Sequence, residues 1–111
     1  MITLLTKQIL ASQSVNGTVY SGAIEFKRAK GFCGMLMIVG GVSTTVTQQV
    51  SLDGSTFYDP VDSDGNALGQ VCSAITADAY HQFSPVIAPY IRFKFVTTGA
   101  SVTAAKLVSQ E

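Results

Sequence analysis

The sequence predicts an all-β protein, a single antiparallel β-sandwich of the jelly-roll or galactose-binding type with seven to nine short strands. Three observations support this. No segment longer than about ten residues repeats its apolar residues at helical spacing, several segments alternate apolar and polar residues, and glycine-rich or aspartate-rich corners separate them. Short strands at this spacing are typical of a sandwich and not of repeated βαβ units.

Size and charge point to one domain, residues 1–111, that works with partners. A chain of 111 residues can bury one core. Its charged content of 13% is well below the ~25% of ordinary soluble domains, and its net charge is zero. Since charge normally keeps a free monomer soluble, we expect other proteins to cover part of this surface.

The first half of the chain contains three predicted strands. In residues 18–27, Ile24 and Phe26 alternate with Glu25 and Lys27. The next segment, GFCGMLMIVGG, is continuously apolar and favours a strand covered on both faces. The third, TTVTQQVSL, alternates most regularly, with Val46, Val50 and Leu52 at one parity.

Turn residues follow that third strand. Asp53-Gly54 predicts a tight type I′ hairpin, because glycine accepts the positive φ that this turn requires. Phe57 and Tyr58 then begin a short returning strand, which Pro60 ends. A second polar connection, DSDGNALG, comes next.

The second half predicts more strands. Residues 70–83 hold one or two, and APYIRFKFVTT places Ile91, Phe93 and Phe95 inward with Arg92 and Lys94 outward. Residues 99–101 form a turn into a last strand, VTAAKLV.

Composition argues against several classes of function. The lysines and arginines are scattered apart from Lys27, Arg28 and Lys30, which argues against nucleic-acid binding. The longest apolar run, Met35 to Val39, is far short of a membrane span. The N-terminus lacks the features of a signal peptide, so we expect cytoplasmic synthesis. Cys33 and Cys72 are expected to be buried free thiols.

The aspartates are interpreted as turn residues. Asp62, Asp64 and Asn66 alternate as in an EF-hand loop, but glycine stands at its fourth position and no glutamate stands at the twelfth. A weak, adventitious cation site is the alternative. A catalytic carboxylate pair among exposed turn aspartates is disfavoured, because such groups remain solvated.

The chain also lacks a convincing nucleophile. His81 is the only histidine, there is no G-x-S-x-G motif, and a Cys–His pair has no support beyond composition. With one histidine and no Cys-x-x-Cys motif, a zinc site does not reach four ligands. We therefore predict no enzyme activity, no cofactor and no metal.

Two tyrosines beside polar turns are candidates for contact with a partner protein or a glycan. Tyr58 and Tyr80 are suited to stacking at a rim, although aromatic residues at alternate strand positions are most simply core. The candidate contact residues are Tyr58, Asp62, Asp64, Asn66 and Tyr80.

Two motifs resemble those of small β-sandwich proteins encoded among the structural genes of tailed bacteriophages. One is of the V-S-x-D-G-x-x-F type, with Val50, Ser51, Asp53, Gly54 and Phe57 in the matching positions. The other is of the P-x-Y-I-R type and comprises Pro89 to Arg92. The likeness, shared with discoidin-like and galactose-binding-like sandwiches, covers about nine-tenths of the chain. The group often has tryptophan in place of Phe57.

The resemblance implies a virion component that binds and does not catalyse: a head decoration, fibre-base, neck or tail-associated subunit. Its expected partners are capsid or tail proteins and copies of itself, without nucleic acid or membrane. A carbohydrate-binding module or host-surface adhesion domain is the alternative.

Overall fold

The computed structural model describes residues 4–25, 33–39, 43–99 and 101–110, and this part of the chain contains nine β-strands. Their bounds are β1 Leu4–Val15, β2 Thr18–Tyr20, β3 Ile24–Glu25, β4 Cys33–Ile38, β5 Thr44–Ser51, β6 Gln70–Ile75, β7 Ala79–Phe83, β8 Tyr90–Thr97 and β9 Ser101–Gln110. The prediction of an all-β chain is confirmed.

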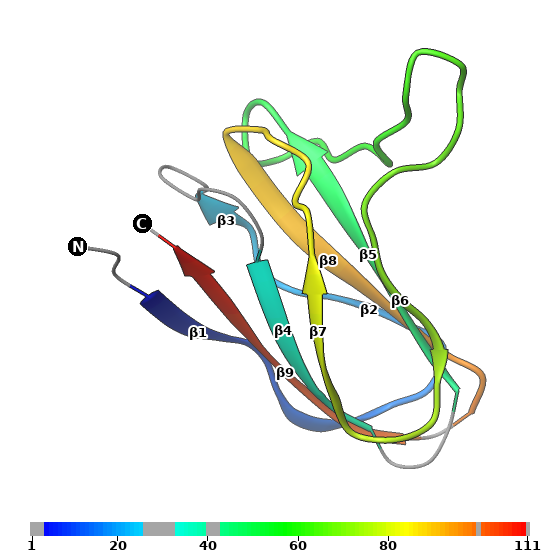
Figure 1. Cartoon of the computed structure of the whole chain (residues 1–111). Helices are drawn as coiled ribbons and strands as arrows, with labels where there is room; N and C mark the ends of the chain where they lie inside the picture. Colours follow the sequence, from blue (N-terminus) through cyan, green and yellow to red (C-terminus); the bar gives the residue numbers. More distant parts are fainter. Residues whose placement is uncertain (1–3, 26–32, 40–42, 100, 111) are drawn as a thin grey trace.

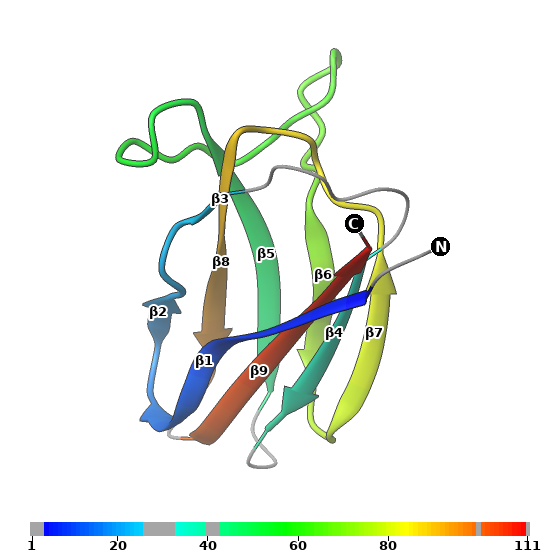
Figure 2. The same cartoon turned by 90° about the vertical axis from the view of Figure 1, so that its left-hand side faces the viewer.

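The strands form two antiparallel sheets stacked as a sandwich (Figures 1 and 2). Sheet I has the order β1-β9-β4-β7, and sheet II has the order β2-β8-β5-β6, with β3 pairing to β8. Apart from β3, the first half of the chain pairs with the second half in reverse: β1 with β9, β2 with β8, β4 with β7, and β5 with β6. This rolled-up hairpin is the jelly-roll arrangement, found in viral capsid and lectin domains.

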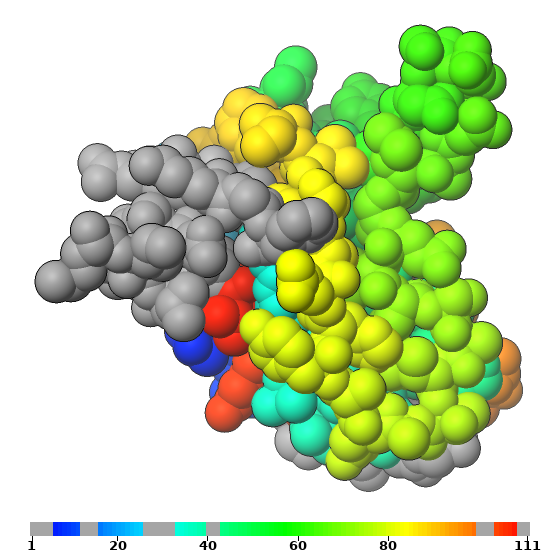
Figure 3. Space-filling view, viewed as in Figure 1, coloured from blue at the N-terminus to red at the C-terminus, as the bar shows by residue number. Residues whose placement is uncertain are grey.

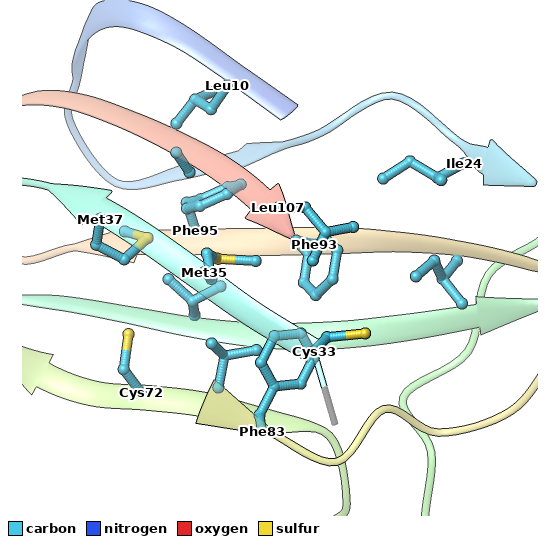
Figure 4. Close-up of a cluster of buried hydrophobic side chains, with 14 of the residues drawn as sticks. Leu10, Ile24, Cys33, Met35, Met37, Cys72, Phe83, Phe93, Phe95 and Leu107 are labelled. Atoms are coloured by element: carbon cyan, nitrogen blue, oxygen red, sulfur yellow. The ribbon is translucent and has the colours of Figure 1, made fainter. Parts of the chain in front are cut away.

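The core lies between the sheets and is built by alternation along the central strands. Met35 and Met37 of β4 face Phe93 and Phe95 of β8 across the sandwich (Figure 4), and all four are fully buried. The rings of Phe83 and Phe93 pack in a T-shaped arrangement at a centroid distance of 5.9 Å. The predicted inward positions of residues 91, 93 and 95 are confirmed.

β4 differs from its prediction as a strand covered on both faces. Leu36 and Ile38 are 37% and 40% exposed, because β4 lies within sheet I, which has one face on the core and the other on the outside. Gly34, on the same outer face, is buried.

The sequence does not predict β1, which is the longest strand of the described residues. Its pairing with β9 shifts register between Gln8 and Leu10 and again between Leu10 and Gln13. Each shift moves later side chains to the opposite face, so the alternation that would identify a strand is lost. Phe26 and the basic cluster Lys27, Arg28 and Lys30 lie outside the described residues.

Between β5 and β6 the chain leaves the sandwich. Residues 52–59, the crossing loop, are followed by residues 60–68, the arm, which projects beyond the end of the sheets (Figures 1 and 3). Across the described ranges, no helix has the length and apolar character needed to traverse a bilayer.

Candidate functional site

The outer face of sheet II holds an arginine between two aromatic rings. The guanidinium carbon of Arg92 lies 4.1 Å from the centroid of the Tyr20 ring and 4.3 Å from that of the Phe57 ring. Tyr20 comes from β2, Arg92 from β8 and Phe57 from the crossing loop, so this contact joins three segments. We call Arg92 with these two rings the arginine clamp.

A chain of polar side chains orients the arginine. The Nε–H of Arg92 donates to Oε1 of Gln49 at 2.7 Å, and Nε2 of Gln49 donates to Oδ1 of Asp59 at 2.8 Å. Gln49 is only 7% exposed, so its amide is held firmly between the two charged groups. Within the described residues the terminal amino groups of Arg92 have no acceptor, and planar guanidinium donors of this kind suit carboxylates.

The clamp explains why the two sequence motifs occur together. In the register of β5 and β8, Val50 is opposite Ile91 and Ser51 is opposite Tyr90, so the motifs run side by side. Phe57 of the first motif then covers Arg92 of the second. The motif residues could be identified from the sequence, but the roles of Gln49 and Tyr20 were missed. The outward position of Arg92 on its strand was the one signal that pointed to contacts on the outer face.

The tight type I′ hairpin predicted at Asp53-Gly54 is wrong in detail. Val50 and Tyr58 pair by two backbone hydrogen bonds, of 3.0 and 2.9 Å, so residues 51–57 all lie between them. Leu52 is therefore past the end of β5 and is 82% exposed. Gly54 does have a positive φ, +80°, and a Cβ there would lie 3.4 Å from the Tyr90 ring.

Asp53 organises this wider loop. Its Oδ1 accepts hydrogen bonds from the backbone N–H groups of Ser55 and Thr56 and from the Ser51 hydroxyl, at 2.8 to 2.9 Å. These bonds, that from Thr56 foremost, lower the pKa of the Asp53 carboxyl to about 2. The carboxylate acts as a substitute for missing backbone pairing.

The arm is a small hairpin whose tip is a turn, as predicted. Gly65 N–H donates to the Asp62 carbonyl and Gly65 has φ +83°, as in a three-residue turn closed by a bulge. Oδ1 of Asp62 accepts from the backbone N–H groups of Asp64 and Asn66, both at 2.9 Å. The bond from the Asn66 backbone is the largest cause of a lowered pKa of Asp62.

The five candidate contact residues occupy separate places. Asp62, Asp64 and Asn66 meet at the arm tip, whereas Tyr58 pairs with β5 of sheet II and Tyr80 lies in β7 of sheet I. The two tyrosines are 64% and 57% exposed. A ligand stacking on Tyr58 would therefore lie on a different sheet from one stacking on Tyr80.

An apolar stripe, defined as Leu36, Ile38 and Tyr80, lies on the outer face of sheet I. Leu36 and Tyr80 are direct cross-strand partners. The Tyr80 phenol lies over Gly34, where an added Cβ would overlap it. The glycine thus provides the space that lets the tyrosine lie flat along the sheet.

The remaining candidate groups are buried singly. Burial raises the pKa of both thiols, Cys33 and Cys72, and both are free, as predicted. His81 is half-buried in β7, and its enclosed Nε2 has no hydrogen-bond partner among the residues that the structure describes. No group of three or more metal-ligating acidic, histidine or cysteine side chains occurs in the part of the chain that the structure describes.

No family model matches the chain, and no curated protein matches it in sequence. Solved structures do match. The SPBc2 prophage-derived protein YomS aligns with a TM-score of 0.57 at 10% identity, over 100% of this chain and 96% of that one. The shared feature is the jelly-roll sandwich.

Part of a viral capsid protein, VP2, has the same architecture. The infectious bursal disease virus VP2 subviral particle aligns with a TM-score of 0.58 at 13% identity, over 98% of this chain but 32% of VP2. The C-terminal CBM6 of LamC from Zobellia galactanivorans aligns with a TM-score of 0.48 at 12% identity, over 95% of this chain and 98% of that module. At these identities the likeness concerns the fold.

Proposed function

We propose that the chain is a structural subunit of a tailed-bacteriophage particle and acts by protein–protein assembly, without catalysis. It would be made in the host cytoplasm and incorporated into the virion as a head decoration, fibre-base, neck or tail-associated protein. The partners would be capsid or tail subunits and further copies of the chain.

The observation that carries this proposal is the apolar stripe on sheet I. Leu36, Ile38 and Tyr80 form a flat, exposed apolar surface on a paired sheet. Burial of such a surface against another protein is the usual source of stability in permanent assemblies. The low charge of the chain and its fold likeness to a prophage protein along both chains support the same function.

Two further exposed apolar residues lie on loops at the same end of the sandwich (Figure 1). Leu52 and Ile87 are 82% and 78% exposed, on the crossing loop and the connection between β7 and β8. Loops at the end of a sandwich commonly provide recognition. A subunit with one apolar sheet face and one apolar end has two surfaces to offer to neighbours in a particle.

The test is the presence of the chain in particles. Particles produced by the virus or prophage that encodes it would be purified, analysed by mass spectrometry and labelled with gold-conjugated antibody against the chain. We expect stoichiometric peptides and labelling at one fixed position. Particles that lack the chain, while the infected cell contains it, would overturn the proposal.

Tyr58 supports a second candidate function, glycan binding at the host surface. Its ring is 64% exposed beside polar turns, which suits stacking on a sugar. A glycan array followed by titration would test this. Selective binding that is lost in Tyr58→Ala and retained in Tyr80→Ala would favour it, and an array without selective binding would count against it.

A further inference from the structure

The acidic and basic residues of this neutral chain are segregated. Residues 52–68, the crossing loop and arm, contain Asp53, Asp59, Asp62 and Asp64, four of the seven acidic residues, and no lysine or arginine. Asp53 and Asp59 accept hydrogen bonds within the crossing loop and from β5, and Asp62 caps the arm turn. Asp64 alone of the four presents a carboxylate that accepts no bond from the described residues.

The outer face of sheet II carries the complementary charge. Arg92 and Lys94 point outward from β8, a central strand of the sheet. Asp59, whose carboxylate binds the Gln49 amide, and Glu25, which lies opposite Tyr90 in the pairing of β3 with β8, already interact within the chain. The Lys94 amino group and the terminal amino groups of Arg92 have no partner in the described ranges, which leaves two cationic groups on the same outer face of β8.

The arm cannot satisfy these cations within its own molecule. It projects away from the end of the sheets (Figures 1 and 3), and no ion pair joins Asp62 or Asp64 to a described lysine or arginine. Beside the charges, Val61 and Leu68 are 57% and 42% exposed, and Tyr20 at the sheet II face is 44% exposed. The arm and the outer face of sheet II therefore each have exposed apolar side chains beside their charged groups.

We propose that the arm of one copy docks on the outer face of sheet II of a second copy, with Asp64 pairing to Lys94 and Arg92. The proposal rests on the assembly function above and names one of its contacts. Arg92 suits this role because the clamp holds its guanidinium in place, so little rotamer freedom is lost on binding. The contact joins two different surfaces, so it generates either a two-fold dimer, in which each arm lies on the face of the other copy, or a head-to-tail ring or filament.

Charge exchange tests the contact. Wild type, Asp64→Lys, Lys94→Asp and the double variant would be compared by sedimentation velocity and light scattering over a range of concentration and salt, with circular dichroism as the check of folding. We expect each single variant to weaken self-association at least ~10-fold. We expect the double variant to regain it, and an equimolar mixture of the two single variants to associate. Added salt should weaken the wild-type oligomer.

Lys7→Asp is the matched control, because Lys7 is an exposed lysine on β1, an edge strand of the opposite sheet that does not pair with β4. An equal loss in this variant, a double variant that stays monomeric, or a wild type that stays monomeric at every concentration would overturn the arm contact. If wild type and both single variants form the same oligomers with equal strength, the arm contact is also overturned, while the proposed function still stands. Absence of the chain from particles would count against the function itself.

Discussion

Gln48 and Val86 exchange two hydrogen bonds as if they were neighbouring strand residues. Nε2 of Gln48 donates to the Val86 carbonyl at 2.7 Å, and Oε1 accepts from the Val86 N–H at 2.9 Å. Gln48 is fully buried, so a side-chain amide from β5 pairs with the backbone connecting β7 to β8. Val86 takes part in no strand pairing among the described residues, and the Gln48 amide occupies the place of a pairing strand.

Replacing this amide should be costly. Gln48→Met keeps the length of the side chain but leaves two backbone groups unpaired, and we expect a loss of about 2 kcal/mol in the free energy of unfolding. Urea denaturation measures it. Gln82→Met, at an exposed position of β7, is the control and should change stability by less than about 0.5 kcal/mol. Equal effects would mean that the Gln48 pairing contributes nothing.

Asp53 should make the stability of the protein depend on pH in the acidic range. Its folded-state pKa of about 2 lies below the ~3.9 of an unfolded aspartate, so folding is favoured by the ionised form. The advantage of wild type over Asp53→Asn should be full above about pH 5 and disappear as the pH falls through about 2. Thermal unfolding of both proteins across this range tests it, and a difference independent of pH would contradict it.

Gly54 should resist substitution because of its backbone. At φ +80° a β-branched side chain is strained, and the added atoms would crowd Tyr90. Gly54→Val should cost about 1–3 kcal/mol. Gly22→Val, where a Cβ meets nothing within 4 Å, is the control. A Gly54 variant as stable as the Gly22 variant would show that the loop adapts.

Gly34 and Tyr80 should be energetically coupled. In Gly34→Ala the new Cβ displaces the Tyr80 phenol, whereas in a Tyr80→Ala background the same change only lowers the entropy of the unfolded chain. We expect Gly34→Ala to be worse in wild type than in the Tyr80→Ala background by about 1 kcal/mol. Unfolding of the four proteins gives the coupling, and additive effects would exclude this contact.

Planarity at residue 92 should matter more than charge. Arg92→Lys keeps the positive charge but loses the stacking on Tyr20 and Phe57 and the bond to Gln49. We expect a loss of about 1–2 kcal/mol. Lys94→Arg, two residues along β8 on the same face, should be neutral within about 0.5 kcal/mol. If the Arg92→Lys protein is as stable as wild type, only the positive charge of residue 92 contributes to stability, and the stacking and the bond to Gln49 do not.

Regular alternation allowed much of the sandwich to be predicted. β8 has apolar residues at positions 91, 93 and 95, and β5 has its two valines at one parity, so the pairing of these faces in the core could be predicted. β1 could not be recognised because register shifts break its alternation. Exposure of Leu36 and Ile38 could not be foreseen, since a continuous apolar strand does not reveal which face will be covered.

The candidate site was harder to predict because it depends on pairing between distant segments. Nothing local to Gln49 says that it will lie opposite Arg92, and only the register of β5 on β8 brings them together. The span of the crossing loop was misjudged because Asp53 accepts three hydrogen bonds that make a wider loop stable. Side-chain capping of this kind competes with the two-residue turn that Asp-Gly favours.

The pairing of β1 with β9 has a consequence for biosynthesis. In the sheet order β1 has β9 as its neighbour, so the first strand made waits for residues 101–110 before it gains a partner. Contacts so distant in sequence close late and slowly. Until residues 101–110 are made, β1 and β4 lack the strand that lies between them, and their unpaired edges are open to aggregation.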